Sequence, residues 1–207
     1  MKFNKIGYLF AFISVVVLLP VSSMKRELGG LGLRPVTSDM FEPVGQRIRS
    51  EIQIISEGLV EAIRNGRIDI ISGFLKEGVN VNTRVTSQFH PYNGFALLHC
   101  AVMLGKLEIA QFLLSNGAAV NVPVDAPGTY FHGFAALHLA IFNRDEFMVR
   151  TLLESGADAD FPVNNLVCSV FHGFTPLLLS LINSSESIVK MILEYDPEVD
   201  YILNNPG

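Results

Sequence analysis

The sequence predicts an all-α solenoid of stacked helix–turn–helix units, because one pattern of apolar residues occurs four times. In the second copy, apolar residues recur at spacings of three and four, first around Leu98 and then around Ile109, as on one face of each of two short helices. Gly105 separates these helices, and Gly117 ends the second one. We expect the four units to bury their apolar faces against each other, at residues 57–82, 94–121, 133–160 and 173–203.

Short motifs recur at fixed positions in these units. The first helices begin with LLHCA, ALHLA or TPLL, and the units close with EGVNVN, NGAAVN or SGADAD. These motifs resemble the ankyrin repeat family over residues 57–203. The resemblance implies a stacked repeat domain that binds a protein partner, and it implies that His99 and His138 tie the loop of one repeat to its neighbour. Leu178 replaces this His in the last unit, as expected of an end unit that has only one neighbour.

The loops between the units are longer than the ankyrin pattern provides. Gly94 and Gly133 are 39 residues apart, and Gly133 and Gly173 are 40 apart, whereas an ordinary ankyrin repeat has about 33 residues. The excess lies just before each Gly, and its β-branched and aromatic residues favour extended β-hairpin fingers. Because insertions on one face of a solenoid commonly form its binding face, we expect these fingers to contact a partner.

Each finger ends in an aromatic residue, a His or Asn, a Gly and a Phe. By the resemblance, this Phe and an apolar residue one helix later face the concave groove; these residues are Phe95, Phe134, Phe174, Met103, Phe142 and Ile182. Because a contiguous exposed apolar patch usually marks an interaction site, we expect an open groove that binds a protein. The alternative is that the fingers, or the segment before the repeats, cover it. The finger residues expected at the interface are Tyr92, Tyr130, Phe131, His132, Phe171 and His172.

The first 23 residues have the layout of an export signal. MKFNK supplies two Lys, residues 6–23 carry no charge, and small residues follow the apolar run. That run has about fourteen residues, fewer than the roughly twenty that span a bilayer. We therefore expect residues 1–23 to be a cleaved signal peptide of an exported protein, periplasmic or secreted, the latter as an effector. A membrane anchor at residues 6–23, or a chain that starts at Met24, is the alternative.

Residues 24–56 separate this segment from the repeats. Their Gly- and Pro-rich first part is typical of a tether. The second part places Ile48, Ile52 and Ile55 on one helical stripe. We expect this part to form an extra helix that caps the first repeat.

The charge argues against nucleic acid as a partner. The formal net charge of −5 becomes −7 when the two Lys of residues 1–23 are removed, and a phosphate backbone requires clustered positive charge. The chain has only two Cys, which is too few for a disulfide framework. We therefore expect a monomer that depends on its apolar core and binds a protein partner.

No motif of a nucleotide-binding loop, zinc protease or nucleophile elbow occurs, so we expect no enzyme and no cofactor. The alternative function is a metal- or small-ligand-binding solenoid, because each finger has one His: His90, His132 and His172. Repeats stack roughly 10 Å apart, so three imidazoles in a row could not converge on one ion. We therefore expect no metal site.

Overall fold

The computed structural model describes residues 44–87, 90–165, 171–183 and 185–195. The predicted signal peptide and the tether before residue 44 lie outside the described residues. Inside them, no helix combines the length and the apolar character needed to cross a membrane. The chain divides into two units, Met1–Ile48 and Arg49–Gly207, and the packing described below is that of the second unit.

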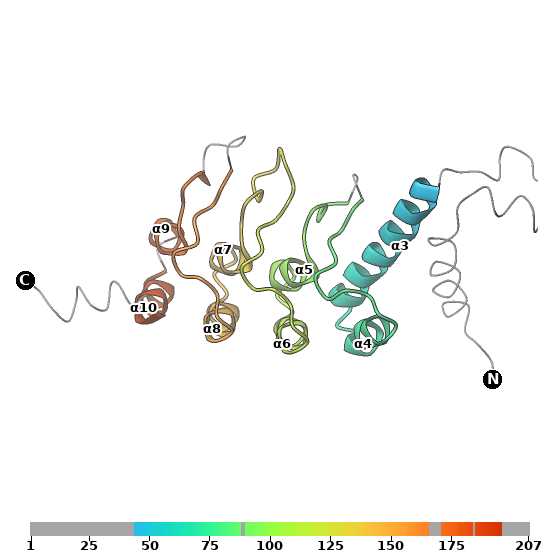
Figure 1. Cartoon of the computed structure of the whole chain (residues 1–207). Coiled ribbons are helices and arrows are strands. Elements are labelled where there is room, and N and C mark those ends of the chain that lie inside the picture. The colour runs from blue at the N-terminus through green and yellow to red at the C-terminus, as the bar shows by residue number, and fades with distance from the viewer. Residues whose placement is uncertain (1–43, 88–89, 166–170, 184, 196–207) are drawn as a thin grey trace, which may run out of the picture. The chain divides into compact units, whose positions relative to one another are not determined.

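Eight helices occur in the described ranges, and they follow each other in four pairs (Figure 1). They are α3 (Val44–Arg64), α4 (Ile68–Lys76), α5 (Leu97–Met103), α6 (Leu107–Ser115), α7 (Ala136–Phe142), α8 (Glu146–Glu154), α9 (Pro176–Ile182) and α10 (Glu186–Tyr195). The first helices of successive pairs pack together, α5 on α7 and α7 on α9, and the second helices pack in the same order, α6 on α8 and α8 on α10. The predicted all-α solenoid is confirmed.

The helix α3 is longer than the sequence predicts. A separate capping helix was expected before residue 57, whereas α3 continues without a break into the first repeat. Its apolar side extends from half-buried Ile55 to fully buried Leu59 and Ile63. Gly58 is exposed, with no atom near the position of a Cβ. Since no residue in this stretch stops the helix, the capping segment and the first repeat share one element.

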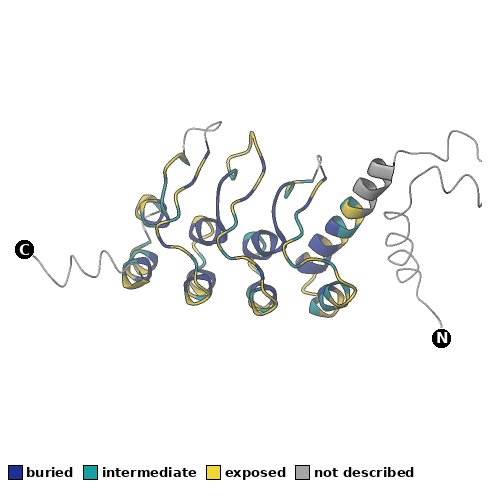
Figure 2. Ribbon diagram, viewed as in Figure 1, coloured by how far each residue is buried: buried dark blue, intermediate teal, exposed yellow. Residues whose placement is uncertain are grey.

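The core is continuous from helix to helix and into the fingers. α5 and α7 are buried along almost their whole length, whereas α6, α8 and α10 each keep an exposed face (Figure 2). Val85, Val124 and Val163, one from each finger, belong to the same buried cluster as these helices. The base of each finger is therefore part of the folded domain.

Each finger is closed at its base by two backbone hydrogen bonds. The amide of Val85 donates to the carbonyl of Phe95 over 2.9 Å, and the amide of Gly94 donates to the carbonyl of Val85 over 2.8 Å. Val124 and Val163 make the corresponding bonds in the next two fingers. In the described finger residues, strand pairing extends no further than one isolated bridge. In the described parts of the first two fingers the additional residues form turns and irregular backbone, whereas the hairpin predicted for residues 165–171 lies mostly outside the described residues.

Candidate functional site

Each finger returns to its first helix through a four-residue turn. The amide of Phe95 donates to the carbonyl of Tyr92 over 2.9 Å, and the equivalent bonds close the turns that begin at Phe131 and Phe171. The third residue of the turn, such as Gly94 with a φ of 80°, adopts the positive φ that a type II turn requires. This turn explains the repeated aromatic–x–Gly–Phe spacing, because it places the first and fourth side chains side by side.

The side chains of these turns form a continuous series of ring contacts, which we call the aromatic ladder. Neighbouring ring centroids are 5.4–6.0 Å apart. All contacts but the first are close to perpendicular, with interplanar angles of 80–84°, which is a favoured aromatic geometry worth about 0.5–1.5 kcal/mol per pair. In order, the ladder consists of Tyr92, Phe95, Phe131, Phe134, Phe171 and Phe174.

The prediction of an open groove lined by the repeated Phe is wrong for two of the three residues. Phe95 is 2% exposed and Phe134 is fully buried. The finger of the following repeat covers each of them: the ring of Phe131 lies 6.0 Å from Phe95, and the ring of Phe171 lies 5.4 Å from Phe134. Phe174 is half-buried, because no such ring follows it in the described residues. The alternative, that the fingers cover the stripe, describes the first two residues.

The apolar residues one helix later remain accessible. Phe142 is 44% exposed, Ile182 is 56% exposed and Met103 is half-buried. The ring of Phe142 stands 5.4 Å from the half-buried ring of Phe131, so the helix ends and the finger turns meet. We call this region the finger–helix surface; its residues are Tyr92, Met103, Tyr130, Phe131, Phe142, Phe171 and Ile182.

The second finger contributes the most exposed side chain of this surface, Tyr130, which is 67% exposed. His132 is half-buried, and its Nδ1 accepts a hydrogen bond from the amide of Ala126 over 3.2 Å. His172 is exposed. Of the predicted finger residues, Tyr92, Phe131 and Phe171 belong to the aromatic ladder, whereas Tyr130 is exposed. One ring nitrogen of His132 is hydrogen-bonded within its own finger.

Neighbouring fingers are held at close range by their backbones. A Cβ on Gly94 would lie 1.9 Å from the carbonyl oxygen of Asp125, whose amide donates to the carbonyl of Gly94 over 3.1 Å. Nη1 of Arg84 donates to the carbonyls of Gly94 and Pro123, over 2.8 and 3.0 Å. Only Gly allows this approach, and the contact fixes the second finger against the first.

Two buried histidines connect the first helices to the fingers. Nδ1 of His99 accepts a hydrogen bond from the amide of Ala96 over 3.0 Å, and its Nε2 lies 2.8 Å from the carbonyl of Val122 in the next finger. Since Nδ1 accepts, the proton is on Nε2 and the ring is neutral. Burial lowers the pKa of His99 and of His138 from 6.5 to about 4. Both residues are therefore structural, as the ankyrin resemblance implies.

Within the described residues, the finger histidines do not come together in a metal site. The described residues include no cluster of three His, Cys, Asp or Glu that could hold a metal ion. Nδ1 of His90 accepts from the amide of Tyr92 over 3.2 Å, so this imidazole, like that of His132, is engaged in its own finger. Burial raises the pKa of the Cys100 thiol to about 12, which leaves it protonated and unreactive.

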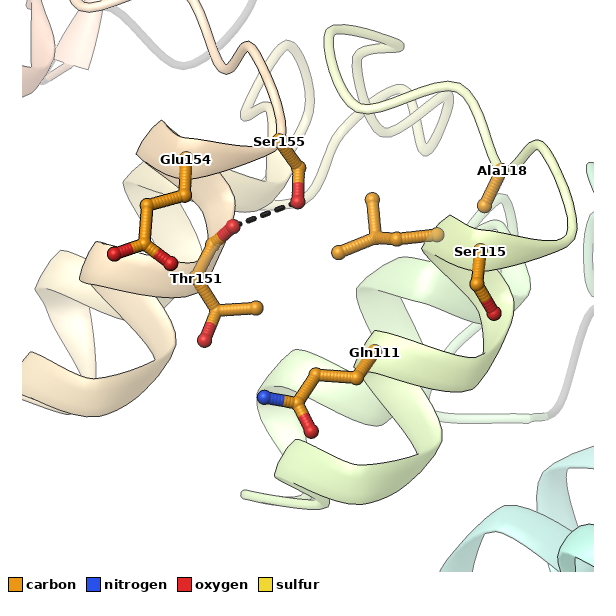
Figure 3. Close-up of a pocket in the computed structure, with 7 residues that line it drawn as sticks. Gln111, Ser115, Ala118, Thr151, Glu154 and Ser155 are labelled. Atoms are coloured by element: carbon orange, nitrogen blue, oxygen red, sulfur yellow. Dashed lines mark hydrogen bonds between the residues drawn. The ribbon is translucent and has the colours of Figure 1, made fainter.

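An open depression of about 480 Å³ lies between the C-terminal ends of α6 and α8 (Figure 3). The hydroxyls of Ser115 and Ser155 donate to carbonyls of their own helices, over 2.8 and 2.7 Å. Glu154 is its single ionisable residue. The depression therefore lacks the paired groups of an active site. Its lining residues are Gln111, Leu114, Ser115, Ala118, Thr151, Glu154 and Ser155.

Comparison with known families agrees with this architecture. Residues 56–124 match the family model described as ankyrin repeats (3 copies), and residues 132–164 match the one described as ankyrin repeat. No curated protein matches the chain. The two matches begin in the second half of α3 and end in the third finger. They include Tyr92, Met103 and Phe142 of the finger–helix surface, whereas its other four residues lie outside the matched ranges.

Proposed function

Because this chain belongs to the ankyrin repeat family, whose members generally bind other proteins, we propose that it is a non-enzymatic binding protein that grips its partner with the finger–helix surface. The observation that carries the proposal is that Tyr130, Phe142 and Ile182 are large and exposed, and that Phe142 contacts the aromatic ladder through Phe131. Large aromatic side chains on a rigid support contribute strongly to protein interfaces, because little conformational entropy is lost on binding.

The charges of the fingers indicate the chemistry of the partner. Between each closing motif and the following Gly, the only charged residues are Arg84 and Asp125, and Arg84 is already bonded to two carbonyls. A neutral, aromatic surface favours an apolar or uncharged polar segment of the partner. Binding should therefore depend only weakly on ionic strength, in contrast to a contact steered by charges.

Affinity capture with matched variants tests the proposal. Tyr130→Ala and Phe142→Ala should each weaken binding of the captured protein by on the order of 2 kcal/mol, roughly 30-fold. Phe147→Ala is the control, because Phe147 is an exposed Phe on α8, outside the finger–helix surface. Thermal unfolding of each variant checks that it is folded. Equal binding by all three variants, or an equal loss with Phe147→Ala, would contradict the proposal, and the same capture after chelation tests the metal-binding alternative.

We also propose that residues 1–23 direct export, since their basic start, apolar run and small residues have the order of a signal peptide. A reporter fused after the complete N-terminal segment should leave the cytoplasm, whereas a reporter on a chain that starts at Met24 should remain there. If both fusions have the same location in the native host, export by this segment is disproved.

A further inference from the structure

In the described residues, α9 exposes an apolar face that the equivalent helices bury. Leu178 is 41% exposed and Leu181 is 55% exposed, whereas His138 and Ile141, the corresponding residues of α7, are fully buried by the next repeat. A Cβ on Gly173 would meet no described atom within 4 Å, although the same position on Gly133 lies 2.7 Å from a backbone oxygen. End repeats normally carry a polar outer face, so the apolar face of α9 is a candidate docking site for further chain.

The chain that follows α10 continues the repeat. YILNN at residues 201–205 lies 40 residues after FPVNN at residues 161–165, and Phe134 and Phe174 are separated by the same 40 residues. Both segments have an aromatic residue first, a branched aliphatic residue third and two Asn last. In register with the repeats, residues 201–205 therefore correspond to the first half of a further finger.

Both halves of a finger contact the preceding repeat: the returning half brings the ring that covers Phe95 or Phe134, and the first half packs against the turn Gly and the His of the first helix. The backbone of Asn164 lies against Gly133, and the ring of Phe161 lies 6.2 Å from that of His138. One finger earlier, the amide of Asp125 donates to Gly94. Half a finger is thus sufficient to cover the positions equivalent to Gly173 and Leu178 in the repeat before it.

We propose that residues 201–205 dock on the open end of the fourth repeat, with Tyr201 over Leu178 and Asn204 against Gly173. The side chains at these positions are complementary. Where the inner repeats have a His that bonds a finger carbonyl, the fourth has Leu178, which offers an apolar contact to an aromatic ring. Leu181 remains outside this contact. Its equivalent in α7 is Ile141, which lies next to the following first helix and not next to a finger: Nδ2 of Asn183, at the end of α9, donates to the carbonyl of Ile141 over 2.9 Å.

A single tryptophan can report this contact, because the chain has none. Tyr201→Trp in the full-length protein should be several-fold less accessible to acrylamide quenching than Tyr130→Trp, which places the indole at the exposed position of the second finger. Adding Leu178→Lys should raise the quenching of Trp at position 201 towards that control, while Leu178→Met should preserve the protection. Circular dichroism confirms that each variant is folded.

Two results would overturn the docking of this segment on its own chain. Quenching at position 201 equal to that of Tyr130→Trp, or unaffected by Leu178→Lys, would show that the segment does not cover α9. Protection that disappears on dilution, together with a dimer in sedimentation, would show that a second copy is the occupant. Protection that is independent of protein concentration and lost with Leu178→Lys supports the proposal.

Discussion

Removal of one ring from the centre of the aromatic ladder should destabilise the whole domain. Phe134 is fully buried, and its ring lies 5.8 Å from Phe131, 5.4 Å from Phe171 and 5.5 Å from His138. Truncation of a buried Phe to Ala costs about 3–5 kcal/mol, because apolar contact is lost and a cavity remains. We expect Phe134→Ala to reach the middle of this range, since its neighbours belong to its own finger, its own helix and the next finger, and cannot all close around the gap.

The assay is urea unfolding followed by far-ultraviolet circular dichroism, with Phe142→Ala as the comparison. Phe142 is also in contact with Phe131, but it is 44% exposed, so its truncation should cost no more than about 1–2 kcal/mol. For a domain of this size, a loss of about 4 kcal/mol in Phe134→Ala lowers the Tm by roughly 10 °C. A loss below about 1 kcal/mol, or the same loss for both variants, would refute the burial of Phe134 by the fingers.

Three further predictions follow from local geometry. The folded pKa of about 4 in His99 and His138 lies below the ordinary 6.5, so the unfolded chain binds protons first and stability falls as the pH drops from 6.5 towards 4. The free energy of unfolding in urea should be lower at pH 5 than at pH 7 by about 2 kcal/mol for each of the two histidines. His138→Gln should remove about half of the total decrease, and equal stability at both pH values would disprove the lowered pKa values. Gly128→Ala should lower the free energy of unfolding only by the strain of a positive φ, about 1–2 kcal/mol. Gly94→Ala should lower it clearly more, because the new Cβ would overlap the backbone of Asp125. Similar unfolding midpoints for the two variants would contradict the close contact between the first and second fingers. Arg144 has a φ of 56°, so Arg144→Gly should raise the free energy of unfolding by about 0.5–1 kcal/mol, and Arg144→Ala, which keeps the strain, should not.

The sequence was sufficient to predict features that depend on neighbours within one repeat. The helix pairs follow from apolar spacings and from glycines such as Gly105 and Gly117, because the relevant contacts lie within a few turns of helix, where periodicity is informative. The accessible positions of Phe142 and Ile182 were implied by the ankyrin resemblance and not by spacing.

Features that depend on contacts between repeats could not be predicted in the same way. The burial of Phe95 is due to Phe131, a residue of the next finger, and no spacing within either repeat indicates that pairing. The continuous α3 was missed for another reason: the boundary between the capping segment and the first repeat came from the repeat pattern, although no residue there stops a helix. One available indication of the ladder was the recurrence of an aromatic residue three positions before each Phe.

The aromatic ladder makes the repeats interchangeable at their junctions. Each repeat carries the Phe that needs a cover and also brings the ring that covers the Phe of the repeat before it, as Phe131 does for Phe95 and Phe171 does for Phe134. Deletion of one internal repeat in register would therefore leave a junction of the same kind, in which Phe171 covers Phe95 in place of Phe131. The length of the array, and with it the number of fingers presented at a fixed pitch, can change by whole repeats without redesign of the core.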